Sequence, residues 1–298
     1  AQDAVQEELR FKGKIKAQSA DMSANMFLPK AAVGQLPAMV IVHASGGPRQ
    51  VDLEYARQLT AMGVASVLAN HYAPRGVTRT VDDQLSVRTE DMLGDAFAML
   101  DALTRDPRID SARIGIMGFS KGGSVALDSS IAKVAERFLP GGPRFALHVP
   151  FYPGCLALYR EPRTTGAPIV LLIAEKDNWV GSAKCIGYAN DLKAAGAKLR
   201  LIVYQGAGHG WDQDRNAHVA NAQFMGRCGW QEQADGGWIE MFTGLRTSGP
   251  GAVPIPGAMA EVMAKCPTRG ASVEVDSRVK DAAMAELRTA VQSSFGVK

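Results

Sequence analysis

The sequence predicts an α/β protein with a mostly parallel central sheet and helices on both of its faces. Short apolar runs, such as residues 37–44 (PAMVIVHA) and 112–118 (ARIGIMG), alternate with segments whose apolar residues recur at helical spacing. These runs are apolar almost throughout, which is typical of strands buried on both faces of a parallel sheet. A chain of 298 residues with 46% hydrophobic residues is also long and apolar enough to bury a sizeable core.

The first half of the chain begins with residues 9–28, which we expect to form one or two edge strands. The strand at 37–44 ends in a loop that reads SGGPR, and Gly63 then separates a helix from a strand at 64–70. The apolar faces of this helix and the next, longer one are predicted from Leu53, Ala56, Leu59 and Met62, and from Leu85, Met92, Ala96, Met99, Leu100 and Leu103.

The second half continues the alternation, with a helix at 182–196 and a final helix that has one apolar face from Val279 to Phe295. Residues 226–275 differ, because they are rich in Gly and Pro and show little periodicity. We interpret them as an irregular excursion from one domain that spans 1–298. The strands of this half are expected at 144–152, 168–177 and 199–205.

Composition excludes several function classes. The net charge is +3 and the basic residues are scattered, so the sequence gives no support for nucleic-acid binding. No apolar run approaches the roughly 20 residues that a membrane helix needs. No Cys/His group has the spacing of zinc ligands, so we expect no metal site.

The stretch GIMGFSKGGSVAL (115–127) is the strongest chemical signal in the chain. A Gly-x-Ser-x-Gly turn between a strand and a helix can hold a serine hydroxyl out above a parallel sheet. Serine needs a neighbouring base, and the base needs a carboxylate. Ser120, Asp177 and His209 occur in the order Ser, acid, His, and each follows a predicted strand, as in the α/β-hydrolase arrangement.

Ordinary structural explanations exist for each of these residues. A Gly-x-Ser-x-Gly string occurs often by chance, Asp177 could cap the next helix, and His209 could be a loop histidine among turn glycines. The agreement of order, strand placement and turn favours a catalytic triad. The other four histidines have poorer positions, and they are His43, His71, His148 and His218.

Serine chemistry also needs two backbone N–H groups for the negative charge of the tetrahedral intermediate. One is expected from Lys121, the residue after the nucleophile. The other is expected from the loop 43–47, with Ala44 the better candidate and Ser45 the second. The glycines of that loop could equally form a plain turn.

With these residues placed, the chain resembles the dienelactone hydrolase family of α/β-hydrolases. The likeness covers about residues 37–295 and includes VHASGG, YAPRG, GFSKGG, AEKDNW and GAGHGWD. It implies hydrolysis of an ester or lactone of small size through an acyl-enzyme, without metal or organic cofactor. Founding members use a cysteine nucleophile and a glutamate after the third strand, whereas this chain has Ser120 and the run His43-Ala44-Ser45. These differences favour serine-esterase chemistry and argue against dienelactone itself as the substrate.

The resemblance also suggests substrate contacts. Arg75 lies near the position at which the family uses an arginine to hold a substrate carboxylate, although it could be a solvent-facing loop residue. Tyr72 and Trp211 are expected to line the acyl pocket or to pack at its rim. A peptidase of the same fold and a catalytically silent binding protein remain as alternatives.

The four cysteines allow three pairings. Cys155 follows one predicted strand and Cys185 lies in the helix after the Asp177 strand, so neighbouring strand ends favour a 155–185 bridge. Cys228 and Cys266 then remain, and they bracket the excursion. Four buried free thiols are the alternative. Two bridges, together with an N-terminus AQDAVQEE that resembles the product of signal cleavage, predict an exported protein.

Overall fold

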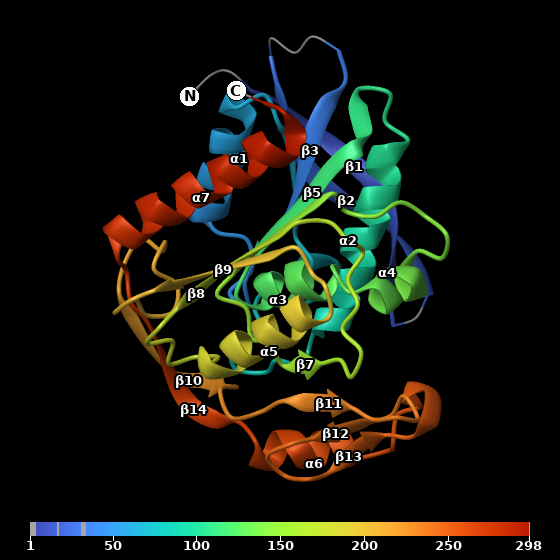
Figure 1. The fold of residues 1–298 in the computed structure, drawn as a ribbon, viewed down its shortest axis with the longest axis vertical. Coiled ribbons are helices and arrows are strands. Elements are labelled where there is room, and N and C mark those ends of the chain that lie inside the picture. The colour runs from blue at the N-terminus through green and yellow to red at the C-terminus, as the bar shows by residue number, and fades with distance from the viewer. Residues whose placement is uncertain (1–3, 17, 31–33, 298) are drawn as a thin grey trace.

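The computed structural model describes residues 4–16, 18–30 and 34–297. Its centre is an eight-stranded sheet in the order β1-β2-β4-β3-β5-β6-β8-β9 (Figure 1). The strands from β4 to β9 in this order pair in parallel, whereas β1 and β2 form an antiparallel hairpin at one edge. The predicted fold class is confirmed. The strands are β1 (Ala4–Ile15), β2 (Gln18–Pro29), β3 (Leu36–Val42), β4 (Ala65–Ala69), β5 (Ile109–Phe119), β6 (Leu147–Phe151), β8 (Ile169–Ala174) and β9 (Leu199–Tyr204).

Helices cover both faces of this sheet, as the alternation of elements predicts. One apolar core lies between the sheet and α1 and α7, and another lies between the sheet and α2, α3 and α5. Successive residues of β3 enter the two cores in turn, with Met39 in one and Val40 in the other, because neighbouring side chains of a strand point to opposite faces. The helices are α1 (Gln50–Ala61), α2 (Thr89–Thr104), α3 (Lys121–Asp128), α4 (Ala132–Phe138), α5 (Ala183–Ala194) and α7 (Ser277–Phe295).

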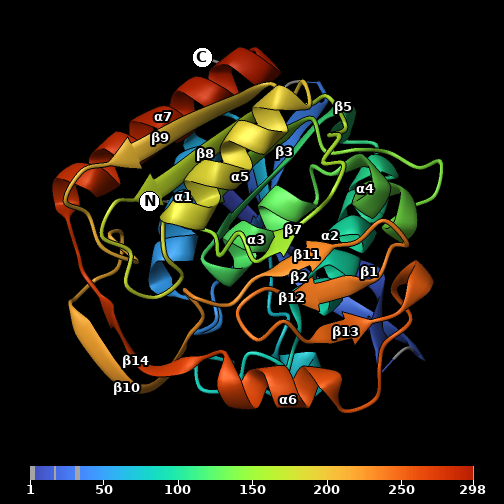
Figure 2. The same cartoon turned by 60° about the horizontal axis from the view of Figure 1, so that its bottom comes forward.

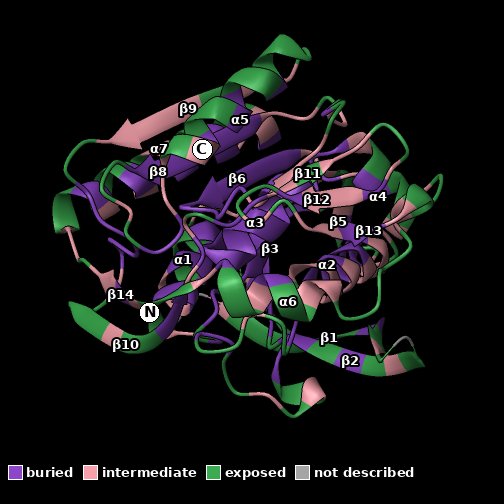
Figure 3. Ribbon diagram, turned by 90° about the horizontal axis from the view of Figure 1, so that it is seen from below, coloured by how far each residue is buried: buried purple, intermediate pink, exposed green. Residues whose placement is uncertain are grey.

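Burial follows the same layers. Every residue of β3, β4, β6 and β8 is buried, and these strands form the buried centre of Figure 3, whereas the β1–β2 hairpin alternates between exposed and buried positions. One predicted core position is wrong. Leu85 is 37% exposed and precedes α2, because the helix begins only at Thr89.

The excursion at 226–275 is more regular than its sequence indicates. It contains three short strands that join β7 in a four-stranded sheet, and a longer strand that pairs with β10. Figures 1 and 2 place the short strands of this segment and its helix α6 together at one end of the molecule. Strands of three residues are too short to show periodicity, which is why the sequence suggests a loop. The elements are β7 (Ala157–Leu158), β10 (Ala217–Phe224), β11 (Trp230–Glu232), β12 (Trp238–Glu240), β13 (Arg246–Ser248), α6 (Ala258–Lys265) and β14 (Thr268–Val273), with 3₁₀ turns η1 (Ala73–Arg75) and η2 (Pro250–Ala252).

Two disulfides fasten these parts, in the predicted pairing. Cys155, after β6, is joined to Cys185 of α5, with a Cα–Cα distance of 5.2 Å. Cys228 is joined to Cys266 across 5.5 Å, and this bridge ties the start of the excursion to the end of α6. Within the described ranges, no helix is both long and apolar enough to cross a membrane.

Candidate active site

The turn between β5 and α3 holds Ser120 in a conformation that few non-glycine residues adopt. Its φ is 53° and its ψ is −112°, between the end of β5 at Phe119 and the start of α3 at Lys121. The flanking glycines are required by close backbone packing. A Cβ on Gly118 would lie 2.2 Å from the carbonyl oxygen of Gly122, and one on Gly122 would lie 2.1 Å from that of Val42. The strand–turn–helix context is that of a nucleophile elbow.

Ser120, His209 and Asp177 meet at the carboxyl ends of their strands. The Oγ atom of Ser120 lies 3.0 Å from Nε2 of His209, and Nδ1 of His209 lies 2.7 Å from Oδ2 of Asp177. Asp177 follows β8, and His209 follows β9. Because the carboxylate can only accept, Nδ1 donates to Asp177 and Nε2 is free to accept the hydroxyl proton of Ser120.

The carboxylate of Asp177 is fixed by its own turn as well as by His209. Its Oδ1 atom accepts hydrogen bonds from the backbone N–H groups of Trp179 and Val180, both at 2.9 Å. Burial alone would raise the pKa of Asp177, but His209 and these N–H donors outweigh it and hold the pKa below its usual value. The helix-cap interpretation of Asp177 is wrong in detail, because α5 starts at Ala183 after Ser182. Asp177 instead caps a tight turn and orients a histidine.

The loop after β3 brings a second backbone segment to the elbow. A Cβ on Gly122 would also lie 2.6 Å from the carbonyl oxygen of His43, so the His43–Ala44 peptide packs directly against α3. Among the described residues, neither the N–H of Lys121 nor that of Ala44 donates to a backbone carbonyl. Ser45 makes other contacts: its Oγ donates to the side chain of Gln84, and its carbonyl accepts from the N–H of Thr80.

The side chain of Lys121 is buried beneath a neighbouring loop. Its Nζ donates to Oγ1 of Thr80 at 3.2 Å, to the carbonyl of Gln84 at 2.8 Å and to the carbonyl of Val87. Burial lowers the pKa of Lys121 to about 7, while three acceptors match the three donors of the protonated amine. The lysine therefore ties the 80–87 loop to the elbow and has no donor left for a substrate.

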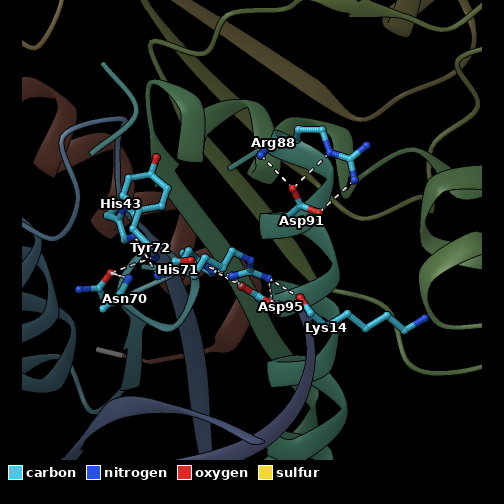
Figure 4. Close-up of polar contacts among 10 residues, drawn as sticks. Lys14, His43, Asn70, His71, Tyr72, Arg88, Asp91 and Asp95 are labelled. Carbon is cyan, nitrogen blue, oxygen red and sulfur yellow. Dashed lines mark hydrogen bonds and ion pairs between the residues drawn. The ribbon is translucent and has the colours of Figure 1, made fainter. Parts of the chain in front are cut away.

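Arg75 does not have the predicted freedom to bind a substrate carboxylate. Its guanidinium makes a bidentate pair with Asp95, at 2.8 Å and 2.9 Å, and both side chains are almost fully buried. Its remaining contacts are to the carbonyls of His71, at 2.7 Å, and Lys14, at 2.8 Å. Figure 4 labels His71, Asp95 and Lys14, which hold this guanidinium. The structure therefore corrects the expected role: both terminal nitrogens of Arg75 donate within the protein.

Tyr72 and Trp211 are likewise interior residues rather than parts of an open pocket. Both are 0% exposed. The Tyr72 hydroxyl contacts Oγ1 of Thr80 at 3.1 Å, and its ring packs edge-on against His43. Trp211 packs against the rings of Tyr152 and Tyr204 at 4.6 Å and 5.2 Å. Burial thus overturns the expectation that either residue lines the pocket or its rim.

Sequence reasoning missed a polar support behind His209. The ring of Tyr152 packs edge-on against His209 at 4.9 Å, and its hydroxyl donates to Oδ1 of the buried Asp212 at 2.6 Å. Burial raises the pKa of Asp212, and the nearby Arg49 and the Tyr152 hydrogen bond oppose that shift. The positive φ of Tyr152, at 35°, could not be read from the run PFYPG.

An apolar cluster beside His209 was also missed. Trp179 packs against His209 with ring centres 5.3 Å apart, and it belongs to a small cluster with Val81, Val180, Ala222 and Ala271. These residues come from four separate segments, so no local pattern could reveal them. As for metals, no group of three or more His, Cys, Asp or Glu in the described chain could hold an ion.

The fold and this elbow define an α/β-hydrolase. Residues 22–235 match the model of the dienelactone hydrolase family, and the chain therefore belongs to that family. It is accordingly a hydrolase of ester bonds, of the dienelactone hydrolase-like esterase and lactonase type.

Relatives and solved structures agree with this assignment. A Bradyrhizobium protein that carries the name 2-oxo-3-(5-oxofuran-2-ylidene)propanoate lactonase is 26% identical over 60% of this chain and 75% of its own. An Escherichia coli K12 protein that carries the name carboxymethylenebutenolidase is 25% identical over 78% of this chain and 87% of its own.

Two solved structures share the fold. The esterase Est2 of Thermogutta terrifontis is 18% identical, with a TM-score of 0.55 over 70% of this chain and 84% of its own. A dienelactone hydrolase-like promiscuous phosphotriesterase from metagenomic libraries is 14% identical, with a TM-score of 0.57 over 97% of this chain and 98% of its own.

Proposed function

We propose that this protein is a serine esterase in which Ser120 is the nucleophile, His209 the general base and Asp177 the acid of the triad. The observation that carries the proposal is the continuous chain from Ser120 Oγ through His209 to Asp177, at 3.0 Å and 2.7 Å. Both distances lie within the range over which a proton passes along a hydrogen bond.

The reaction then follows from these contacts. Ser120 attacks the carbonyl carbon of the ester as its proton moves to Nε2 of His209, and Asp177 stabilises the imidazolium that forms. The oxygen of the tetrahedral intermediate accepts hydrogen bonds from the N–H groups of Lys121 and Ala44. His209 returns the proton to the departing alcohol. Water then attacks the acyl-enzyme by the same route and releases the acid.

We assign neutral, largely apolar esters as the substrate class. Three basic side chains close to the elbow and the Ala44 loop are paired within the protein: Arg75 with Asp95, Lys121 with its three acceptors, and Arg49 with Asp52 at 2.6 Å. The cluster around Trp179 offers apolar surface beside His209. The Bradyrhizobium relative, in contrast, is named for a lactone that bears a carboxylate.

A serine-reactive fluorophosphonate and two substrates test these assignments. The protein should be labelled at Ser120, and Ser120→Ala should lose the label, lose turnover by several orders of magnitude and keep its melting temperature. Labelling of the Ala variant, or turnover above a few per cent, would overturn the triad. For the substrate class, kcat/KM should be at least about tenfold higher for p-nitrophenyl butyrate than for mono-p-nitrophenyl succinate, because burying an uncompensated carboxylate is costly. Equal values would overturn it.

The two disulfides support an exported protein that works in an oxidising compartment, because reducing compartments keep such thiols free. Thiol titration of the denatured, unreduced protein should detect no free thiol. Four free thiols would remove both bridges and the case for export.

A further inference from the structure

The loop that carries Ala44 is held by a histidine outside the triad. The ring of His43 is fully buried, and its Nδ1 atom lies 2.8 Å from the carbonyl oxygen of Ala44. Its Nε2 atom lies 3.1 Å from the backbone nitrogen of His71. A carbonyl can only accept and a backbone N–H can only donate, so the two contacts require the neutral ring with its proton on Nδ1. Burial, with the neighbouring His71, also lowers the pKa of His43 well below its usual value.

His71 is itself anchored to a helix. Its Nδ1 atom pairs with Oδ2 of Asp95 at 2.8 Å, and Asp95 lies on α2 with no exposed surface. Arg75 joins the same group as His71 and Asp95, which Figure 4 labels, because one of its nitrogens donates to both Asp95 and the carbonyl of His71. The contacts therefore form one connected series from Arg75 and Asp95 through His71 and His43 to Ala44.

The carbonyl of Ala44 is held by more than the imidazole. It also accepts from the N–H of Gly47 at 3.0 Å and lies 3.4 Å from the hydroxyl of Tyr72. On the other side of the residue, the carbonyl of His43 packs against Gly122. The two peptide planes that flank Ala44 are thus both fixed, and with them the direction of its N–H.

We propose that His43 is a positioning residue, which acts through Ala44 to aim the second oxyanion donor at the reacting carbonyl. This inference rests on the proposed function, because Ala44 has such a role only if Ser120 attacks an ester. His43 touches no substrate in this scheme, since both of its ring nitrogens are engaged within the protein. Arg75 and Asp95 serve the same end from a distance by fixing the backbone of His71.

His43→Phe and a matched control test the proposal. The phenyl ring fills the space but cannot donate to Ala44, so kcat should fall by about ten- to a hundredfold with KM nearly unchanged, as expected for partial loss of an oxyanion donor. His43→Asn keeps a donor close to the Nδ1 position and should recover part of that loss. The control is His148→Phe, because His148 is equally buried and its Nδ1 contacts the carbonyl of Ala126 at 3.0 Å. It should lose stability but keep kcat within about twofold.

Two outcomes would overturn the inference: a kcat for His43→Phe within twofold of the parent, or equal losses in the two Phe variants. Loss of labelling at Ser120 in the parent would instead defeat the proposed function. A measurement on the unaltered protein covers the case in which His43→Phe does not fold. With five histidines in the chain, ¹⁵N spectra at pH 7 should assign the His43 proton to Nδ1, and a proton on Nε2 would contradict the proposal.

Discussion

Two buried His–Asp pairs in the described part of the chain have almost identical geometry. Nδ1 of His209 lies 2.7 Å from Oδ2 of Asp177, and Nδ1 of His71 lies 2.8 Å from Oδ2 of Asp95. They differ in what faces the other ring nitrogen. Nε2 of His209 contacts the hydroxyl of Ser120, whereas Nε2 of His71 is buried and has no hydrogen-bond partner in the described chain. A His–Asp pair is therefore not a catalytic signature by itself.

The two carboxylates differ in the same sense. Asp177 is held by backbone N–H groups and keeps one oxygen for its histidine, but Asp95 is shared between His71 and the guanidinium of Arg75. In the proposed mechanism Nε2 of His209 takes up and returns a proton, whereas the second pair is an anchor held by the ion pair between Asp95 and Arg75. We expect substitutions in the two pairs to separate loss of turnover from loss of stability.

The largest effect on kcat is expected for substitution of His209, in contrast to the same substitution of His71. His209→Asn removes the proposed base for Ser120, so kcat should fall by several orders of magnitude. His71→Asn keeps the backbone N–H that faces His43 and should lower kcat by less than about tenfold. Steady-state kinetics with p-nitrophenyl butyrate measure both, and similar losses would show that the comparison is wrong.

Substitution of the two carboxylates should separate loss of turnover from loss of stability most clearly. Asp177→Asn should lower kcat by about ten thousandfold with little change in stability, because the neutral amide favours the wrong tautomer of His209. Asp95→Asn should lower the free energy of unfolding by about 3–5 kcal/mol, since it leaves the buried Arg75 without its counterion. Urea unfolding followed by fluorescence gives the second value. A stability loss in Asp177→Asn as large as in Asp95→Asn would contradict this division.

A smaller effect on stability is expected for the contact between Tyr152 and Asp212 behind His209. Tyr152→Phe removes the hydroxyl that donates to buried Asp212, and the unfolding free energy should fall by about 1–3 kcal/mol. Tyr204 is the matched control, because it also packs on Trp211 but its hydroxyl has no hydrogen-bond partner in the described chain. Tyr204→Phe should be nearly neutral. Equal losses in the two variants would mean that the Asp212 contact adds nothing.

The smallest effect is expected for Asp128, a buried carboxyl with no ion-pair partner among the residues that the structure describes. Burial raises the pKa of Asp128 to about 8. An acid with a raised pKa in the folded state binds more protons when folded, so the contribution of Asp128 to stability should decline from about pH 4 to pH 8. Asp128→Asn should flatten this decline and be more stable than the parent at pH 8. A decline of unchanged slope in the variant would remove Asp128 as its cause.

The sequence predicted the fold and the proposed triad because both depend on local patterns in a fixed chain order. Ser120, Asp177 and His209 each follow a strand that is apolar throughout, and parallel strands bring their carboxyl ends together. Nothing comparable marks the Arg75–Asp95 pair, since only the position of α2 against the sheet brings the two together. The YAPRG motif therefore suggested a substrate contact that the tertiary structure excludes.

The excursion at 226–275 also has tertiary pairings that could not be predicted from local sequence patterns. Its strands are three residues long, and β11 pairs with β7, which lies some 70 residues earlier in the chain. A pairing of that kind leaves no periodic trace in either segment. The cysteines were more informative, because a covalent bridge needs only two residues of one type at accessible strand and helix ends.

The glycine contacts of the elbow determine which parts of this enzyme mutation can alter. Gly118 and Gly122 pack against main chain of the elbow and of β3, and a Cβ on Gly123 would lie 2.5 Å from the carbonyl of Phe151, at the end of β6. The position of Ser120 is thus set by main chain, which mutation of other side chains does not remove. Under the proposed function, exchanging Trp179 or Val81 would change the apolar surface beside His209 without moving the backbone of Ser120. Changes in the side chains of this cluster can therefore accumulate while the main chain keeps Ser120 in place.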